Sequence, residues 1–166
     1  MAIDPNKYKV TTSERYMPVV LLLDVSGSMR RTGKIDSLYE ATVKMIETFA
    51  EAGKKEIPYK VAIITFGENV EYHTLYTDAT KAFADNLPKF KARGGTPLGK
   101  ALLMAKDLIE DKTITKLRWY RPAVVLVSDG KPAGGWETPL RDFISSGRTA
   151  RCQRLSMGIG SGEEVR

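Results

Sequence analysis

Asp24, Ser26 and Ser28 place one carboxylate and two hydroxyls at alternate positions directly after an apolar run, residues 19–23. A run that is apolar at every position is typical of a strand buried on both faces of a parallel sheet. Asp24 would then lie at the carboxyl end of that strand, where open α/β sheets build their sites. Hard oxygen donors of these kinds suit Mg²⁺, Mn²⁺ or Ca²⁺. The alternative is a strand end followed by a serine that caps a helix.

Two further segments, distant in sequence, add donors of the same kind. Asp129 follows a second apolar run, residues 123–127, and Gly130 after it permits a tight turn. Thr96 lies in the loop Gly94-Gly95-Thr96-Pro97-Leu98, where Pro97 suits the first turn of a helix. Strands that end alike in a parallel sheet bring such loops to one edge. The sequence therefore predicts a metal site at that edge.

The set Asp24, Ser26, Ser28, Thr96 and Asp129 matches a metal-ion-dependent adhesion site, and the chain resembles a von Willebrand factor A-type domain from about residue 18 to residue 160. The amino-acid sequence of residues 94–98 and 155–160 is most similar to that of bacterial tellurite-resistance (TerY-like) members of the family. The resemblance implies that the three hydroxyls coordinate Mg²⁺, with Mn²⁺ or Ca²⁺ as substitutes. The two aspartates would act directly or through bound water.

The same resemblance implies a role for the site. The open position of the metal would take an Asp or Glu carboxylate from a protein partner, which makes the domain a non-enzymatic, metal-dependent interaction module. TerY-like proteins imply a stress-response or defence setting, with a kinase, phosphatase or ATPase encoded nearby as a candidate partner. No cofactor other than the metal is implied.

Hydrophobic periodicity predicts an α/β fold: a doubly wound, mostly parallel sheet with one antiparallel edge strand and helices on both faces. Residues 1–16 form a polar lead-in, and residues 17–166 form the domain. We expect strands at residues 19–23, 59–66, 70–75, 121–128 and 155–159, and helices at residues 35–52, 80–87, 98–109 and 138–146.

The family pattern continues beyond its counterpart of residues 155–159 with a helix, a strand and a closing helix. Only a few residues follow here, so we expect a C-terminally incomplete domain, with residues 155–159 at an uncovered edge. Neither a signal peptide nor an apolar run of membrane-spanning length is visible in the sequence. Cys152 is the only cysteine, so an internal disulfide is impossible and a cytoplasmic location is favoured.

Two enzymatic alternatives find weak support. Residues 94–101 match the glycine-and-lysine frame of a nucleotide-binding loop, but Ala101 stands where a hydroxyl should hold Mg²⁺ and no strand precedes the loop. A metal-assisted phosphoesterase could use Asp24 and Asp129 to activate water. Such an enzyme would need a general base, and His73, the only histidine, is predicted to face solvent on an edge strand.

The formal net charge is +6, which favours acidic ligands. Five basic residues neighbour the metal-site loops in sequence: Arg30, Arg31, Lys34, Arg93 and Lys131. A second group could contact nucleic acid: Arg141, Arg148, Arg151 and Arg154. That group lacks interleaved aromatic residues and any nucleic-acid motif, so a protein ligand is the stronger prediction and no membrane contact is expected.

Overall fold

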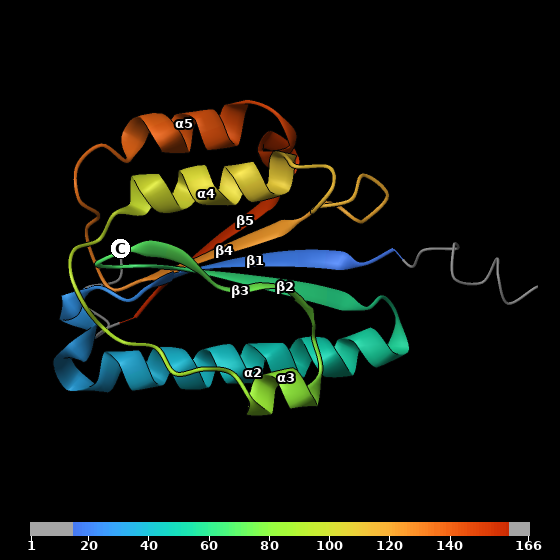
Figure 1. The fold of residues 1–166 in the computed structure, drawn as a ribbon, viewed down its shortest axis with the longest axis horizontal. Helices are drawn as coiled ribbons and strands as arrows, with labels where there is room; N and C mark the ends of the chain where they lie inside the picture. The colour runs from blue at the N-terminus through green and yellow to red at the C-terminus, as the bar shows by residue number, and fades with distance from the viewer. Residues whose placement is uncertain (1–14, 160–166) are drawn as a thin grey trace, which may run out of the picture.

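The computed structural model describes residues 15–159, which form one five-stranded sheet with helices on both faces (Figure 1). The strands are β1 (Met17–Asp24), β2 (Tyr59–Phe66), β3 (Val70–Asp78), β4 (Ala123–Ser128) and β5 (Gln153–Gly158). The helices are η1 (Gly27–Gly33), α2 (Lys34–Lys55), α3 (Lys81–Asp85), α4 (Leu98–Glu110), α5 (Glu137–Ser145) and η2 (Arg148–Arg151). The predicted fold class is confirmed.

Strand β1 is the centre of the sheet, whose order is β3-β2-β1-β4-β5. It pairs in parallel with β2 on one side and β4 on the other. Strand β3 is the antiparallel edge, and β5 adds to β4 in parallel. Because β1, β2 and β4 all run the same way, the loops that follow them gather at one edge, at the left in Figure 1.

Alternation along β1 divides the core between the two faces. Val19, Leu21 and Leu23 pack with the buried side of α2. Val20 and Leu22 pack instead with α4 and α5, and all five side chains are almost completely buried. This two-sided burial explains why the run is apolar at every position.

The sequence-based boundaries differ from the structure at several places. Helix α2 runs past Gly53 to Lys55, because its register is held by the buried face at Leu38, Ile46 and Ala50 and tolerates one glycine. Strand β5 begins two residues early, at Gln153. The 3₁₀ turns η1 and η2 were not predicted, since short turns of this kind carry no hydrophobic periodicity.

Strand β5 is an edge of the sheet in the described part of the chain, and its residues are exposed. Leu155 and Met157 retain 62% and 51% of their accessible surface. Residues 160–166, and residues 1–14 of the predicted lead-in, lie outside the described residues. Tyr16 of the lead-in is described and packs edge-on against Trp119. Within residues 15–159, none of the helices combines the length and apolarity needed to cross a membrane.

Phe143 fixes α5 to the sheet and gives a direct test of the second core. Its side chain is 1% exposed, whereas that of its neighbour Ile144 is 42% exposed. We expect Phe143→Ala to lower the free energy of unfolding by about 3–5 kcal/mol, the usual cost of removing a buried aromatic ring. Ile144→Ala should stay within about 0.5 kcal/mol of wild type, as exposed substitutions do. Urea unfolding of the two variants measures the difference; equal losses would contradict this packing.

Candidate metal centre at the carboxyl edge of the sheet

Asp24 ends β1 and is completely buried. Its Oδ1 accepts a hydrogen bond from the Ser26 backbone N–H at 2.8 Å, and its Oδ2 accepts one from the Ser128 hydroxyl at 2.6 Å. A buried carboxylate needs such donors to replace lost solvation. The two bonds hold the carboxylate between the loop after β1 and the end of β4.

Ser26 and Ser28 follow on the turn that leads into η1. Their hydroxyl oxygens lie 3.0 Å apart, and Ser26 is 2% exposed while Ser28 is exposed. Two oxygens at this separation can serve neighbouring positions around one small cation. The predicted alternative of a capping serine is not supported, because Ser26 makes no side-chain capping hydrogen bond.

Asp129 lies one residue beyond β4 and is 5% exposed at its side chain. Its Oδ2 lies 3.5 Å from the ammonium nitrogen of Lys34, whose side chain is 15% exposed. Lys34 is the first residue of α2, directly after η1. Its ammonium group therefore links the segment that follows β1 to the Asp129 carboxylate after β4. The Asp129 carboxylate is thus already paired with one positive charge at this edge of the sheet.

Thr96 is brought to the same edge by backbone hydrogen bonds. The Gly27 N–H donates to the Gly94 carbonyl at 2.9 Å, which ties the serine loop to the Thr96 loop. The Ala133 N–H donates to the Thr96 carbonyl at 2.9 Å, which ties the loop after β4 to the same segment. The three predicted loops are therefore neighbours in space, with Thr96 half-buried between them.

Two glycines allow these loops to pack so closely. A Cβ on Gly67 would lie 2.5 Å from the Arg93 carbonyl oxygen and 2.6 Å from that of Val25. Gly94 has a φ of +75°, and a Cβ there would lie 2.5 Å from the Glu68 backbone. Neither close approach is possible with a side chain present.

The donor set fits a hard divalent cation. Within residues 15–159, three or more His, Cys, Asp or Glu side chains never gather closely enough to hold a metal ion. Any metal at this edge therefore depends on the hydroxyls as well as on Asp24 and Asp129. Oxygen-only donors of this kind are typical of Mg²⁺, Mn²⁺ and Ca²⁺ sites rather than of sites built on thiolates or imidazoles.

Two contacts were missed by sequence reasoning. The Ser128 hydroxyl binds Asp24, and the Lys34 ammonium pairs with Asp129. Ser128 precedes Asp129 directly, so the repeated strand-end pattern was a signal that could have drawn attention to it. The sequence marks Lys34 only as one of several basic residues near the metal-site loops.

The residues considered for catalysis in the sequence have structural contacts or lack the context that catalysis needs. His73 is half-buried rather than solvent-facing, packs edge-on against Phe90, and has Nε2 at 2.9 Å from the Pro88 carbonyl oxygen. Burial raises the pKa of the Cys152 thiol to about 11, so it stays protonated at neutral pH. Residues 87–97 contain no strand, so the nucleotide-loop frame lacks the strand it requires.

Some of the basic residues are bonded to other parts of the protein, and others are exposed. Arg30 donates to the Ala92 carbonyl, and Arg93 lies 3.8 Å from Glu68, while Arg31 and Lys131 are exposed. In the second group, Arg148 donates to the Ile109 and Thr115 carbonyls. Arg148 and Arg151 belong to η2, just before the amino end of β5 and thus away from the metal-site edge. An arginine engaged with backbone carbonyls is less available for phosphate contacts.

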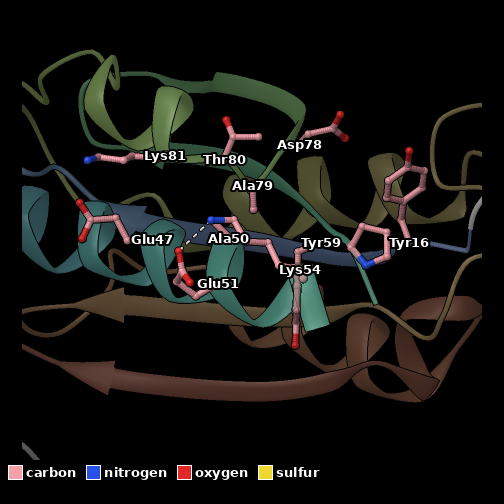
Figure 2. Close-up of a pocket in the computed structure, with 12 residues that line it drawn as sticks. Tyr16, Glu47, Ala50, Glu51, Lys54, Tyr59, Asp78, Ala79, Thr80 and Lys81 are labelled. Carbon is pink, nitrogen blue, oxygen red and sulfur yellow. Dashed lines mark hydrogen bonds and ion pairs between the residues drawn. The ribbon is translucent and has the colours of Figure 1, made fainter. Parts of the chain in front are cut away.

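A hollow of the described surface shown in Figure 2 is lined by residues from other parts of the fold than this edge. It has a volume of about 630 Å³ and lies between the last turns of α2 and the segment from Asp78 to Lys81. Its rim carries both signs of charge, including the exposed pair of Glu51 and Lys54. None of the predicted metal ligands lines it.

Comparison with known proteins decides the family. The model of the von Willebrand factor type A domain matches residues 19–131, from the first strand to just beyond Asp129. The chain belongs to this family. An uncharacterised protein of Mycobacterium tuberculosis is 30% identical over 144 residues, which cover 86% of this chain and 21% of that protein. Pig inter-alpha-trypsin inhibitor heavy chain H4 is 30% identical over 130 residues, 73% of this chain and 13% of that protein.

Solved structures share the fold at low sequence identity. Proximal thread matrix protein 1 from the mussel byssus, in a structure with a zinc-occupied metal-ion-dependent adhesion motif, aligns with a TM-score of 0.69 and 16% identity over 90% of this chain and 39% of its own. The von Willebrand factor type A protein of Catenulispora acidiphila aligns with a TM-score of 0.64 and 20% identity. The alignment covers 88% of this chain and 34% of that one. The chain thus spans 21% and 13% of the length of the two sequence relatives and under half of these structures.

Proposed function

We propose that this von Willebrand factor A domain binds one divalent cation at the carboxyl edge of its sheet and uses it to capture an acidic residue of a protein partner. Its ligands are Asp24, Ser26, Ser28, Thr96 and Asp129. The observation that carries the proposal is the buried Asp24 carboxylate, bonded to the Ser26 N–H and the Ser128 hydroxyl, beside the Ser26 and Ser28 hydroxyls on loops joined by backbone hydrogen bonds. Mg²⁺ is the proposed metal, with Mn²⁺ or Ca²⁺ as substitutes.

The charge of this donor set favours binding of an anion. Three of the five proposed ligands are neutral hydroxyls, so the two aspartates balance the charge of the ion without making the site net negative. The bound ion is often the largest local charge in such a site and keeps an attraction for one more anionic oxygen. An Asp or Glu side chain of a partner supplies that oxygen without requiring a chemical step.

The proposed biological role rests on fewer observations than the metal site does. The similarity of residues 94–98 and 155–160 to TerY-like proteins is the basis for proposing a bacterial stress-response or defence role. A kinase, phosphatase or ATPase encoded nearby is the corresponding partner class. The mussel protein with zinc in its adhesion motif supports divalent metal binding in the family.

The test of the proposed function compares capture of partner proteins under four conditions. Immobilised wild type and Asp24→Asn are each exposed to bacterial extract with Mg²⁺ or with a chelator. We expect the same discrete partners to bind only to wild type in Mg²⁺, and soluble Asp-containing peptides to compete with them. Partners that bind equally in chelator, or equally to Asp24→Asn, would contradict the proposal.

Lys34 is expected to compete with the metal for Asp129. Replacing it by glutamine removes a positive charge 3.5 Å from the carboxylate. We expect Lys34→Gln to bind Mg²⁺ more tightly, by about three- to tenfold, since even a solvent-exposed ion pair can be worth about 1 kcal/mol and this pair is largely buried. Lys44→Gln, an exposed change on the same helix, is the control. Calorimetry that finds unchanged or weaker binding in Lys34→Gln would show that the two cations do not compete.

We also expect no hydrolysis of ATP or p-nitrophenyl phosphate with Mg²⁺ or Mn²⁺. The Nε2 of His73 lies 2.9 Å from the Pro88 carbonyl oxygen, which can only accept, so this nitrogen carries its proton and is not a free general base. Colourimetric phosphate release from wild type and Asp24→Asn should be indistinguishable. Turnover that follows the protein through purification and disappears in Asp24→Asn would favour the metal-assisted phosphoesterase instead.

A further inference from the structure

A second hollow of about 470 Å³ lies beside the proposed metal position and shares Thr96 with it. We call it the Thr96 hollow. Its walls are the turn between β2 and β3, the loop before α4, the first turns of α4, and Ala133 in the loop after β4. Its size falls within the range of about 300–1,000 Å³ that is typical of ligand pockets. Part of any segment bound at the metal would pass over it.

The floor of the Thr96 hollow is apolar. Val70 and Met104 are half-buried, and both pack on the core beneath α4. Pro97 and Ala133 complete the apolar part of the lining. Apolar surface of this kind gains free energy by contact with an aliphatic or thioether side chain, and methionine adapts its shape to different ones.

The rim of the hollow carries one negative and one positive side chain, and only the negative one is paired with an opposite charge. Glu68 lies 3.8 Å from Arg93, so its charge is partly balanced. Lys100 is exposed, and no ion pair or hydrogen bond of its side chain is recorded within residues 15–159. It lies in the first turn of α4, where the helix dipole is also positive. The rim therefore favours an additional carboxylate near Lys100.

The spacing of these groups suits an extended chain. Thr96 lies in the loop before α4 and Lys100 in the first turn of that helix, and both line the Thr96 hollow. In an extended peptide, side chains two residues apart lie on the same side and are about 6.6 Å apart. A carboxylate at the metal thus places the side chain two residues away over the hollow.

We propose that the Thr96 hollow selects the partner: it takes an aliphatic side chain two residues from the metal-bound Asp or Glu, and Lys100 takes a second acidic side chain beside it. This inference rests on the proposed function. The occupant is an extended acidic segment of a protein with at least one aliphatic residue. Met104 and Lys100 are the residues that determine its specificity.

The test uses the full chain and a synthetic library of nonapeptides with a fixed central Asp, each other position being scanned in Mg²⁺. Wild type should enrich Leu, Ile, Val or Met two residues from the Asp, and a second Asp or Glu nearby. Lys100→Glu should weaken binding of the enriched peptides about tenfold and lose the preference for the second acid, because a rim charge is reversed. Its control is Lys44→Glu, which makes the same change in net charge on an exposed face of α2.

The apolar floor is tested in the same library. Met104→Gln should weaken binding of the aliphatic peptides by about fivefold, whereas Leu103→Gln, at a position 49% exposed that does not line the hollow, should not. Val70→Thr, which keeps the shape of the side chain, is a second variant in case Met104→Gln unfolds. All variants should bind Mg²⁺ alone as wild type does.

Two failures are distinguishable. Peptides that bind in Mg²⁺ without an aliphatic preference, or whose binding is unchanged in Lys100→Glu and Met104→Gln, overturn the Thr96 hollow as a specificity site and leave the metal-dependent interaction standing. A library in which no peptide binds in a Mg²⁺-dependent manner contradicts the proposed function, and this inference falls with it.

Discussion

Asp24→Asn should lower the affinity of the protein for Mg²⁺ and Mn²⁺ by about 100-fold or more, since changing a group that only hydrogen-bonds a metal ligand already costs about 10- to 100-fold. The substitution removes one of the two charged ligands at a wholly buried position. Asparagine keeps the shape of the side chain. Its oxygen can still accept from the Ser26 N–H, and its amide can donate to the Ser128 hydroxyl, so the fold should survive.

Calorimetric titration with both metals measures the loss. The matched control is Asp36→Asn, which removes the same charge from an exposed position in the first turn of α2 and should change metal affinity by less than about twofold. Unchanged affinity in Asp24→Asn, or an equal loss in Asp36→Asn, would remove Asp24 from the ligand set.

Alanine is the less informative substitution at this position. The position of Asp24 at a strand end predicts that alanine would leave the fold intact, because such residues often lie outside the core. That interpretation is wrong for Asp24, which is 0% exposed and accepts two hydrogen bonds. Alanine would leave the buried donors unpaired, at a cost of about 1–3 kcal/mol each. A loss of metal binding in Asp24→Ala would therefore mix unfolding with loss of a ligand.

Gly94→Ala should disturb the metal site and the fold together, whereas Gly95→Ala should do neither. Gly94 combines a φ of +75° with a Cβ position 2.5 Å from the Glu68 backbone. Gly95 has no atom within 4 Å of its Cβ position and no positive φ. Relieving the first clash must move the Thr96 loop away from the turn between β2 and β3. We expect a loss of about 2–4 kcal/mol in unfolding free energy, consistent with backbone strain combined with steric overlap.

The measurement for the glycine pair is twofold. Thermal unfolding should show a lower midpoint for Gly94→Ala alone, and calorimetry on the folded fraction should show weaker Mg²⁺ binding. The link between them is the bond from the Gly27 N–H to the Gly94 carbonyl, which joins the two hydroxyl-bearing loops. A Gly94→Ala variant with normal stability and normal metal affinity would show that these loops do not position the ligands.

The fold was predictable because its strongest signals are local. Residues 19–23 are apolar at every position since β1 is covered by α2 on one face and by α4 on the other. Strand β3 is the antiparallel edge, and its residues are all half-buried or exposed, without a strict period of two, since its pairing with β2 contains register shifts. The family assignment follows from the same strand ends and loops.

The contacts inside the site were predictable only in part. The types of Asp24, Ser26 and Ser28 indicate oxygen donors, but nothing in their spacing says that Ser128 would donate to Asp24. That bond joins residues from β1 and β4, and it depends on the register of the two strands, in which Leu23 lies opposite Val127. The pairing of Lys34 with Asp129 depends likewise on how η1 turns the chain into α2.

The central claim is that one divalent ion binds where the three loops meet. Crystals soaked in MnCl₂ and measured for anomalous scattering locate Mn²⁺ directly. The account predicts one strong peak about 2–2.5 Å from the Ser26 and Ser28 hydroxyl oxygens, the coordination distance of hard cations, and its disappearance in Asp24→Asn. A map without a peak there, or with its main peak at another place on the protein, would contradict the account.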